Sequence, residues 1–111
     1  MKILTAPILT AFAKQGYTGN KETKDIKVVM KMFNPAGAGT FYLYEKLDDD
    51  TYMAYVNLGD PTYAELGAVS LTELEEYRGR MGLGIERDMH FPIGKYTVRE
   101  VMDKVKAGGH V

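Results

Sequence analysis

The fold is decided by residues 40–58, which read TFYLYEKLDDDTYMAYVNL. Two runs rich in aromatic and β-forming residues, 40–46 and 51–58, flank a short acidic turn at 48–50. Runs of this composition that are bounded by turn residues are typical of strands, and so short a link favours antiparallel pairing. The sequence therefore predicts a β-hairpin in the middle of the chain.

Two further segments extend this hairpin into a sheet. Residues 26–33 alternate between two faces and are followed by an Asn-Pro-Ala-Gly-Ala-Gly loop at 34–39. A weaker strand is expected at 63–69, after a turn at 59–61. These short links predict a four-stranded antiparallel meander, with one face covered by helices. In the first strand the residues expected on one face are Ile26, Val28, Met30 and Met32.

A helix is expected before the sheet. Thr5 is a good N-cap, Pro7 falls in the first turn, and Gly16 ends the helix. Its inner face is predicted to comprise Ile8, Leu9, Phe12 and Ala13.

Two helices are expected after the sheet, each opening with a capping box. Ser70 with Glu73 begins one, which should stop at Gly79, and Thr97 with Glu100 begins the other. The resulting architecture is α+β, with an N-terminal helix, a four-stranded antiparallel sheet and two C-terminal helices. The predicted inner residues of the two later helices are Leu71, Leu74 and Tyr77, then Val98, Val101, Met102 and Val105.

The length of 111 residues fits a single domain, with a core of about 3–107 and a short loose tail at 108–111. The absence of cysteine excludes disulfides, iron–sulfur clusters and a thiol nucleophile. No apolar run approaches the roughly 20 residues that span a bilayer, so we expect a cytoplasmic protein with no membrane partner.

The net charge is −1, so we do not expect a nucleic-acid partner. Charge is nevertheless unevenly distributed along the chain. Residues 1–35 carry six lysines against two acids, residues 36–77 one lysine against nine acids, and residues 78–111 seven bases against four acids. Either the acidic middle offers a complementary surface to a partner, or it folds back on the chain's own basic ends. We favour the second interpretation.

The most unusual segment is residues 78–88, RGRMGLGIERD, in which three glycines lie beside three arginines. Glycine backbones and arginine side chains together can hold a small anionic or nucleotide ligand. The spacing matches neither a dinucleotide fingerprint nor a P-loop. The alternative is a helix stop followed by an irregular connection. The candidate anion-binding residues are Arg78, Arg80, Gly82, Gly84 and Arg87.

The triplet Glu86-Arg87-Asp88 has two readings. In an extended segment both carboxylates share a side and could bind a divalent metal or perform acid–base catalysis, with His90 nearby. We favour a structural salt-bridge node in which Arg87 pairs with the acidic segment, and we predict no metal.

Tyrosines concentrate in the hairpin. Tyr42 and Tyr44 share one face of their strand, and with Tyr52 they could form a surface on which a ligand ring stacks. The alternative is ordinary core and cross-strand packing. The neighbouring acids, Glu45 and 48–50, disfavour RNA and leave protein contact more plausible.

Motifs for nucleophilic triads, zinc proteases and calcium loops are absent from the sequence. We therefore predict no cofactor and lean against an enzyme, with a carboxylate- or metal-dependent activity of Glu86 and Asp88 as the less favoured alternative.

Several runs together resemble one bacterial family. They are ELGAVSLTELE at 65–75, RG at 78–79, GL at 82–83, IERD at 85–88, KMFNP at 31–35 and FY at 41–42. The chain resembles a domain-of-unknown-function family that is common on plasmids, integrative elements and phages. It departs from that pattern at Arg80-Met81 and at Ala68-Val69. The resemblance implies an accessory or anti-defence role by association.

These observations predict a non-enzymatic binding module of a mobile element that acts through a protein partner. The alternative is a sequestering homo-oligomer that binds a small anion or nucleotide through the Arg/Gly segment.

Overall fold

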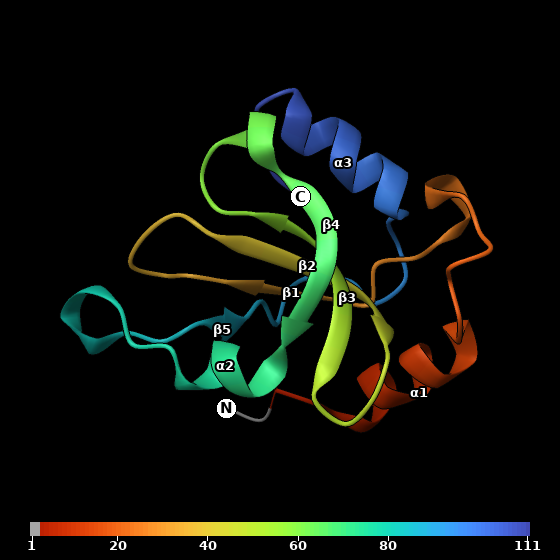
Figure 1. The fold of residues 1–111 in the computed structure, drawn as a ribbon, viewed down its shortest axis with the longest axis horizontal. Helices are drawn as coiled ribbons and strands as arrows, with labels where there is room; N and C mark the ends of the chain where they lie inside the picture. Colours follow the sequence, from red (N-terminus) through yellow and green to blue (C-terminus); the bar gives the residue numbers. More distant parts are fainter. Residues whose placement is uncertain (1–2) are drawn as a thin grey trace.

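The computed structural model describes residues 3–111, apart from the side chain of Arg80 (Figure 1). It is a small α+β domain, as predicted, with helices on both sides of an antiparallel sheet. The helices are α1 (Ala6–Gln15), α2 (Leu71–Glu76) and α3 (Val98–Lys106). Short 3-10 turns are η1 (Thr23–Asp25), η2 (Pro61–Tyr63) and η3 (Arg80–Gly82). The strands are β1 (Met30–Phe33), β2 (Thr40–Lys46), β3 (Thr51–Asn57), β4 (Glu65–Ser70) and β5 (Glu86–Arg87).

The sheet has five strands in the order β4-β3-β2-β1-β5, where we expected four. The central hairpin is confirmed, with Thr40 opposite Asn57 and Tyr42 opposite Tyr55. The additional strand is β5, whose two residues pair with the end of β1. A two-residue strand carries no periodicity of its own, so it exists only because β1 presents a free edge.

Both faces of the sheet are covered, whereas we expected helices on one face. In Figure 1, α3 lies above the sheet and α1 and α2 lie below it. The central strand β2 is apolar on both faces, which explains the arrangement. Phe41 and Leu43 pack toward α1 and α2, and Tyr42 and Tyr44 pack toward α3.

The helix starts are confirmed, and the inner faces are narrower than predicted. Only Ile8 and Phe12 of the four predicted inner residues of α1 are buried, while Leu9 is 41% exposed. These two residues are four apart, so α1 contacts the sheet along one line. At α2, Ser70 accepts the Glu73 backbone N–H, but the helix ends at Glu76, before Gly79, and Tyr77 is exposed. The reciprocal capping box forms at α3, and its three valines are buried.

The strand predicted at 26–33 is regular only from Met30 onward. Residues 26–28 instead pair with 94–98: the Val28 N–H donates to the Tyr96 carbonyl, and Ile26 accepts from the Val98 N–H. Ile26 and Val28 therefore lie in the core below α3, whereas Met30 and Met32 lie in the opposite core. The alternation predicted for one face is wrong because the segment changes partners at residue 29.

The C-terminal tail, predicted to be loose, lies against the sheet. The Lys31 ammonium donates to the main-chain oxygen of Val111 over 2.8 Å, and Val111 packs on the core below α3. Within residues 3–111 no helix is long and apolar enough to cross a membrane.

Candidate functional site

The Arg/Gly segment forms a helix stop. The Arg78 guanidinium donates from Nη1 to the carbonyls of Glu75 and Tyr77, each over 2.7 Å. It thereby satisfies carbonyls left without partners at the end of α2. The absence of a side chain at Gly84 makes room for this arginine, because a Cβ there would lie 2.6 Å from Nη1. Gly82 has φ +72°, in the left-handed region that glycine adopts readily, and helps turn the chain.

The surroundings of this segment do not favour an anion. The hollow beside it, about 370 Å³, is lined by Arg78 together with the carboxylates Glu75 and Glu86. The two carboxylates near this arginine would repel an anionic ligand. Arg87 lies apart from the turn, on β5, and the side chain of Arg80 lies outside the described residues. Anion binding by these residues stays a prediction. The hydrogen bonds from Arg78 to the Glu75 and Tyr77 carbonyls show that this side chain stabilises the end of α2.

The charged triplet at 86–88 is split between two environments. Glu86 is exposed opposite Phe33, Arg87 is half-buried opposite Met32, and Asp88 forms an ion pair with Lys31 (Nζ–Oδ2 3.7 Å). Asp88 thus has a basic partner from the N-terminal third of the chain. Among the described residues, no group of three or more acids and histidines is placed to hold a metal ion.

The three tyrosines considered for stacking are core residues. Tyr42, Tyr44 and Tyr52 are 2%, 4% and 0% exposed. Their rings pack inside the protein: Tyr52 lies 5.2 Å from the Phe12 ring, centroid to centroid. Burial raises the pKa of all three hydroxyls. With their faces covered, these rings offer no surface to a base in this conformation.

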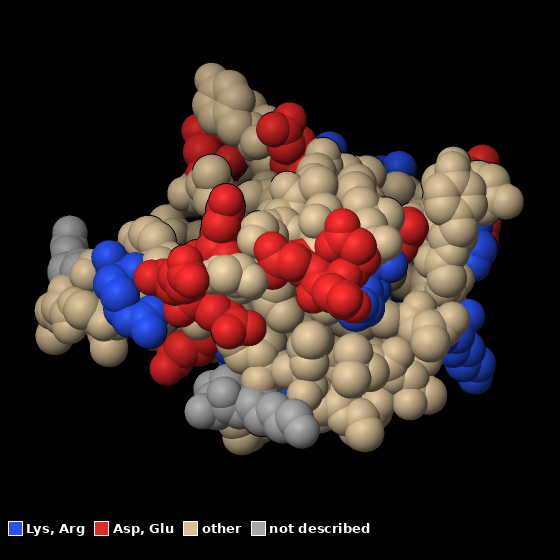
Figure 2. Space-filling model, turned by 60° about the horizontal axis from the view of Figure 1, so that its bottom comes forward, with Lys and Arg blue, Asp and Glu red and all other residues tan. Residues whose placement is uncertain are grey.

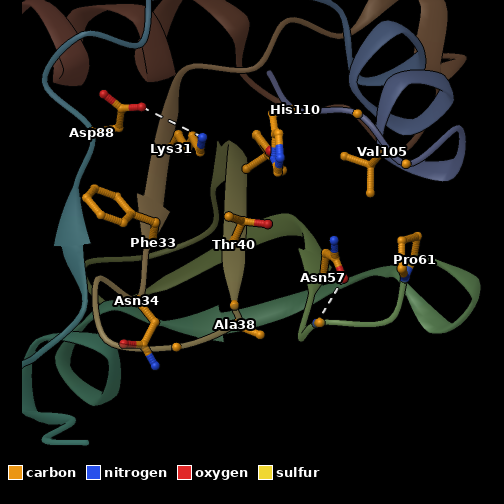
Figure 3. Close-up of a pocket in the computed structure, with 16 residues that line it drawn as sticks. Lys31, Phe33, Asn34, Ala38, Thr40, Asn57, Pro61, Asp88, Val105 and His110 are labelled. Atoms are coloured by element: carbon orange, nitrogen blue, oxygen red, sulfur yellow. Dashed lines mark hydrogen bonds and ion pairs between the residues drawn. The ribbon is translucent and has the colours of Figure 1, made fainter. Parts of the chain in front are cut away.

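The structure reveals a hollow that the sequence did not indicate, which we call the Lys31 hollow (Figure 3). It lies on the α3 side of the sheet, beyond the end of that helix, and its volume is about 550 Å³. Its floor is formed by β1, β2 and β3, and its walls by the loops at 34–39 and 59–61 and the tail at 108–110. The side chains that line it include Lys31, Phe33, Thr40, Asn57, Pro61, Asp88, Val105 and His110.

Lys31 is the charged centre of this hollow, with its side chain only 14% exposed. Its ammonium lies 5.7 Å from the Tyr42 ring centroid, in addition to its contacts with Asp88 and Val111. Burial raises the pKa of Tyr42, and hydrogen bonding to Thr40 and to the Val111 backbone offsets part of that rise. Tyr42 is therefore a neutral hydroxyl beside a fixed cation.

Further hydrogen-bond donors face the same space. The Asn57 side-chain oxygen accepts the Gly59 N–H over 3.0 Å, which leaves its NH₂ group to donate elsewhere. Figure 3 shows Lys31, Thr40, Asn57 and His110 around one common space, with Val105 beside them. The arrangement combines one cation with neutral donors.

A second feature is an acidic face, which we define as the carboxylates of the 48–50 turn and of α2. Asp50 joins the two elements, because its side chain accepts from the Thr72 N–H over 2.7 Å and from the Ser70 hydroxyl over 2.5 Å. These hydrogen bonds lower the pKa of Asp50. Figure 2 shows the acids gathered on one surface, with basic side chains mostly at its margins. The members are Asp48, Asp49, Asp50, Glu73, Glu75 and Glu76.

Our expectation that the acidic middle of the chain folds back on the basic ends stays a prediction. The ion pair seen inside the segment joins two of its own residues, Lys46 and Asp49, over 3.4 Å. The turn and α2 are adjacent in space, so their charges add to one another. The six carboxylates of the acidic face therefore form one negatively charged surface.

The third feature is the outer edge of β4, next to the acidic face. All six of its residues pair with β3, and in the described part of the chain no strand pairs with its other side. A groove of about 450 Å³, the edge groove, runs beside it. It is lined by Val56, Leu58, Asp60, Tyr63, Glu65, Gly67, Ala68 and Val69.

Comparison with known proteins identifies a family, but the description of that family states no function. A family model described as "Protein of unknown function (DUF2958)" matches residues 3–111. No curated protein and no solved structure matches the chain.

Proposed function

The chain belongs to the DUF2958 family, which is described as a protein family of unknown function. From its surface we propose that it is a non-enzymatic protein-binding module. Its ligand is an extended, basic segment of a partner protein, which binds along β4 as an additional strand. The observation that carries this proposal is the open edge of β4, which has acidic side chains at both ends.

The backbone of β4 is available for strand addition. An edge strand presents unpaired N–H and C=O groups, and proteins usually protect it with lysine, proline or a bulge. The six residues of β4, ELGAVS, include no lysine and no proline, and their register with β3 is regular. An extended peptide can pair with such an edge through main-chain hydrogen bonds.

The edge groove can select side chains of that peptide. Gly67 opens its centre, since a Cβ built there would meet no atom within 4 Å. Two apolar side chains nearby are largely exposed, Leu58 at 72% and Tyr63 at 79%. An apolar side chain from an added strand would cover this surface and remove it from water.

Charge selects the sign of the partner. Asp60 and Glu65 lie at the start of β4, and the acidic face lies at its end, where Ser70 passes into α2. A basic segment would be attracted at both ends, and the attraction would weaken with salt. A second copy pairing through the same edge would bring like charges together, which disfavours self-association.

The test begins with selection of binders from a random peptide library. The strongest peptide is synthesised, and its affinity is measured by fluorescence anisotropy at two salt concentrations. We expect lysine or arginine alternating with apolar residues, and amide resonance shifts concentrated at 63–70. Gly67→Phe, which fills the groove, and Glu65→Lys, which reverses a flanking charge, should each weaken binding at least about tenfold. Glu22→Lys is the matched control, because it makes the same charge change at an exposed site on η1's N-terminal flank.

Two results would contradict the proposal. One is selection of peptides that lack basic residues or bind Gly67→Phe as tightly as the wild type. The other is a stable dimer in light scattering whose formation Gly67→Phe abolishes, since the edge would then serve self-association. The accessory role in a mobile element and the action against a defence system stay predictions from the resemblance.

A further inference from the structure

We propose that the Lys31 hollow binds a small phosphate monoester of nucleotide size. This site lies on the α3 side of the sheet and shares no lining residue with the edge groove. The proposal is therefore independent of strand addition at β4.

The size and walls of the hollow suit a small molecule. Its volume of about 550 Å³ falls within the range of about 300–1,000 Å³ typical of ligand pockets. Five of its sixteen lining residues are glycines, so a ligand can approach the backbone closely at those positions. These are Gly37, Gly39, Gly59, Gly108 and Gly109.

Lys31 supplies the recognition of an anion. Its ammonium is held in place by a main-chain oxygen of Val111 at 2.8 Å and by Asp88 at 3.7 Å. A phosphate oxygen is a strong, charged acceptor, so it can compete with the Val111 main-chain oxygen for the same donor. A lysine ammonium binds phosphate as a point charge, so Lys31 attracts the anion without fixing its orientation.

The neutral donors surround the position that such a phosphate would take. The side chains of Asn57 and His110 lie around the same space as Lys31 (Figure 3), whereas the Thr40 hydroxyl is already hydrogen-bonded to Tyr42. Asn57 and His110 can donate hydrogen bonds to the remaining phosphate oxygens.

The rest of the hollow suits the organic part of the ligand. Phe33, Pro61 and Val105 provide apolar surface around the polar centre. Asp88 repels a phosphate placed against it, but its carboxylate accepts hydrogen bonds from sugar hydroxyls. A phosphate on Lys31 with hydroxyls toward Asp88 satisfies both charges, and a sugar phosphate such as a nucleoside monophosphate has both groups.

The probes are AMP, CMP, GMP and UMP, titrated into ¹⁵N-labelled protein at fixed ionic strength. We expect at least one to shift the amide resonances of the lining glycines and His110 saturably, with the matching nucleoside at least about tenfold weaker. Inorganic phosphate should displace the bound nucleotide.

Paired variants distinguish this site from others. Lys31→Met should weaken binding at least about tenfold, and Lys27→Met, at an exposed lysine nearby, should not. Ala38→Trp fills the hollow and retains Lys31, so it should abolish binding even if Lys31→Met fails to fold. Ala13→Trp, at an exposed alanine on α1, is its control. The proposal is overturned if no nucleotide shifts these resonances at millimolar concentration, if the nucleoside binds equally well, or if Ala38→Trp retains full affinity.

Discussion

Removing the side-chain amide of Gln15 should destabilise the protein by about 2 kcal/mol. Gln15 is the last residue of α1, and its side-chain amide lies between the main chains of Lys27 and Tyr44. Its oxygen accepts the Lys27 N–H over 2.8 Å, and its NH₂ group donates to the Lys27 carbonyl over 2.8 Å and to the Tyr44 carbonyl. It thereby satisfies main-chain groups where β1 and β2 do not pair.

The magnitude follows from which of these groups water can reach. Lys27 is exposed, so its two main-chain groups can bond water when the amide is lost. Tyr44 is buried, and an unsatisfied buried carbonyl costs about 1–3 kcal/mol. Gln15→Met keeps the length and helix propensity of the side chain and removes the amide. For 111 residues the unfolding entropy is about 0.23 kcal/mol/K, so about 2 kcal/mol lowers Tm by about 9 °C.

Differential scanning calorimetry of Gln15→Met beside Lys14→Met measures this difference. Lys14 precedes Gln15 and is exposed, so its replacement should stay within about 0.5 kcal/mol of the wild type. If Gln15→Met melts within about 2 °C of the wild type, the amide does not stabilise this junction and the reasoning is refuted.

Three other perturbations test the packing and its charges. Tyr55→Phe should leave stability unchanged or raise it in urea denaturation, because its buried hydroxyl has no hydrogen-bond partner among the described residues; a loss above about 1 kcal/mol would contradict this. Leu43→Ala should cost about 2–5 kcal/mol in the same assay, since Leu43 is fully buried on the central strand, and a loss below about 1 kcal/mol would show that the core collapses around the gap. Asp50 has a lowered pKa in the folded protein, so its contribution is complete above its ordinary pKa of 3.8 and is lost as the pH falls through the lower, folded value. Asp50→Asn should therefore flatten the fall in stability between about pH 5 and about pH 2, and an unchanged slope would show that Asp50 is not responsible.

Local signals predicted most of the helices and strands. The hairpin at 40–58 and the helix starts at Thr5, Ser70 and Thr97 depend on residues close together in sequence, so they could be identified without a structure. The α+β class followed from their order. The acids of 36–77 were also evident, although the gathering of six of them into the acidic face depended on Asp50 reaching Ser70 and Thr72.

Features that depend on distant partners could not be predicted in this way. The strand β5 has two residues, and it exists because β1 offers an edge. Residues 26–28 turn to the opposite face because they pair with 94–98. A period-two pattern cannot reveal such an exchange of partners. It separates alternate residues into two sets, but it does not say which set lies on which face of the folded sheet.

The sequence by itself determined the local elements, because capping, turn chemistry and hydrophobic periodicity act within a few residues. The tertiary structure alone decided the sites. The Arg/Gly segment became a helix stop, and the stacking tyrosines became core, once each was packed against distant partners. The Lys31 hollow joins three strands, two loops and the tail, which only folding brings together. The Lys31 ammonium and the main-chain oxygen of Val111, 80 positions apart, meet because the tail packs on the sheet beside α3.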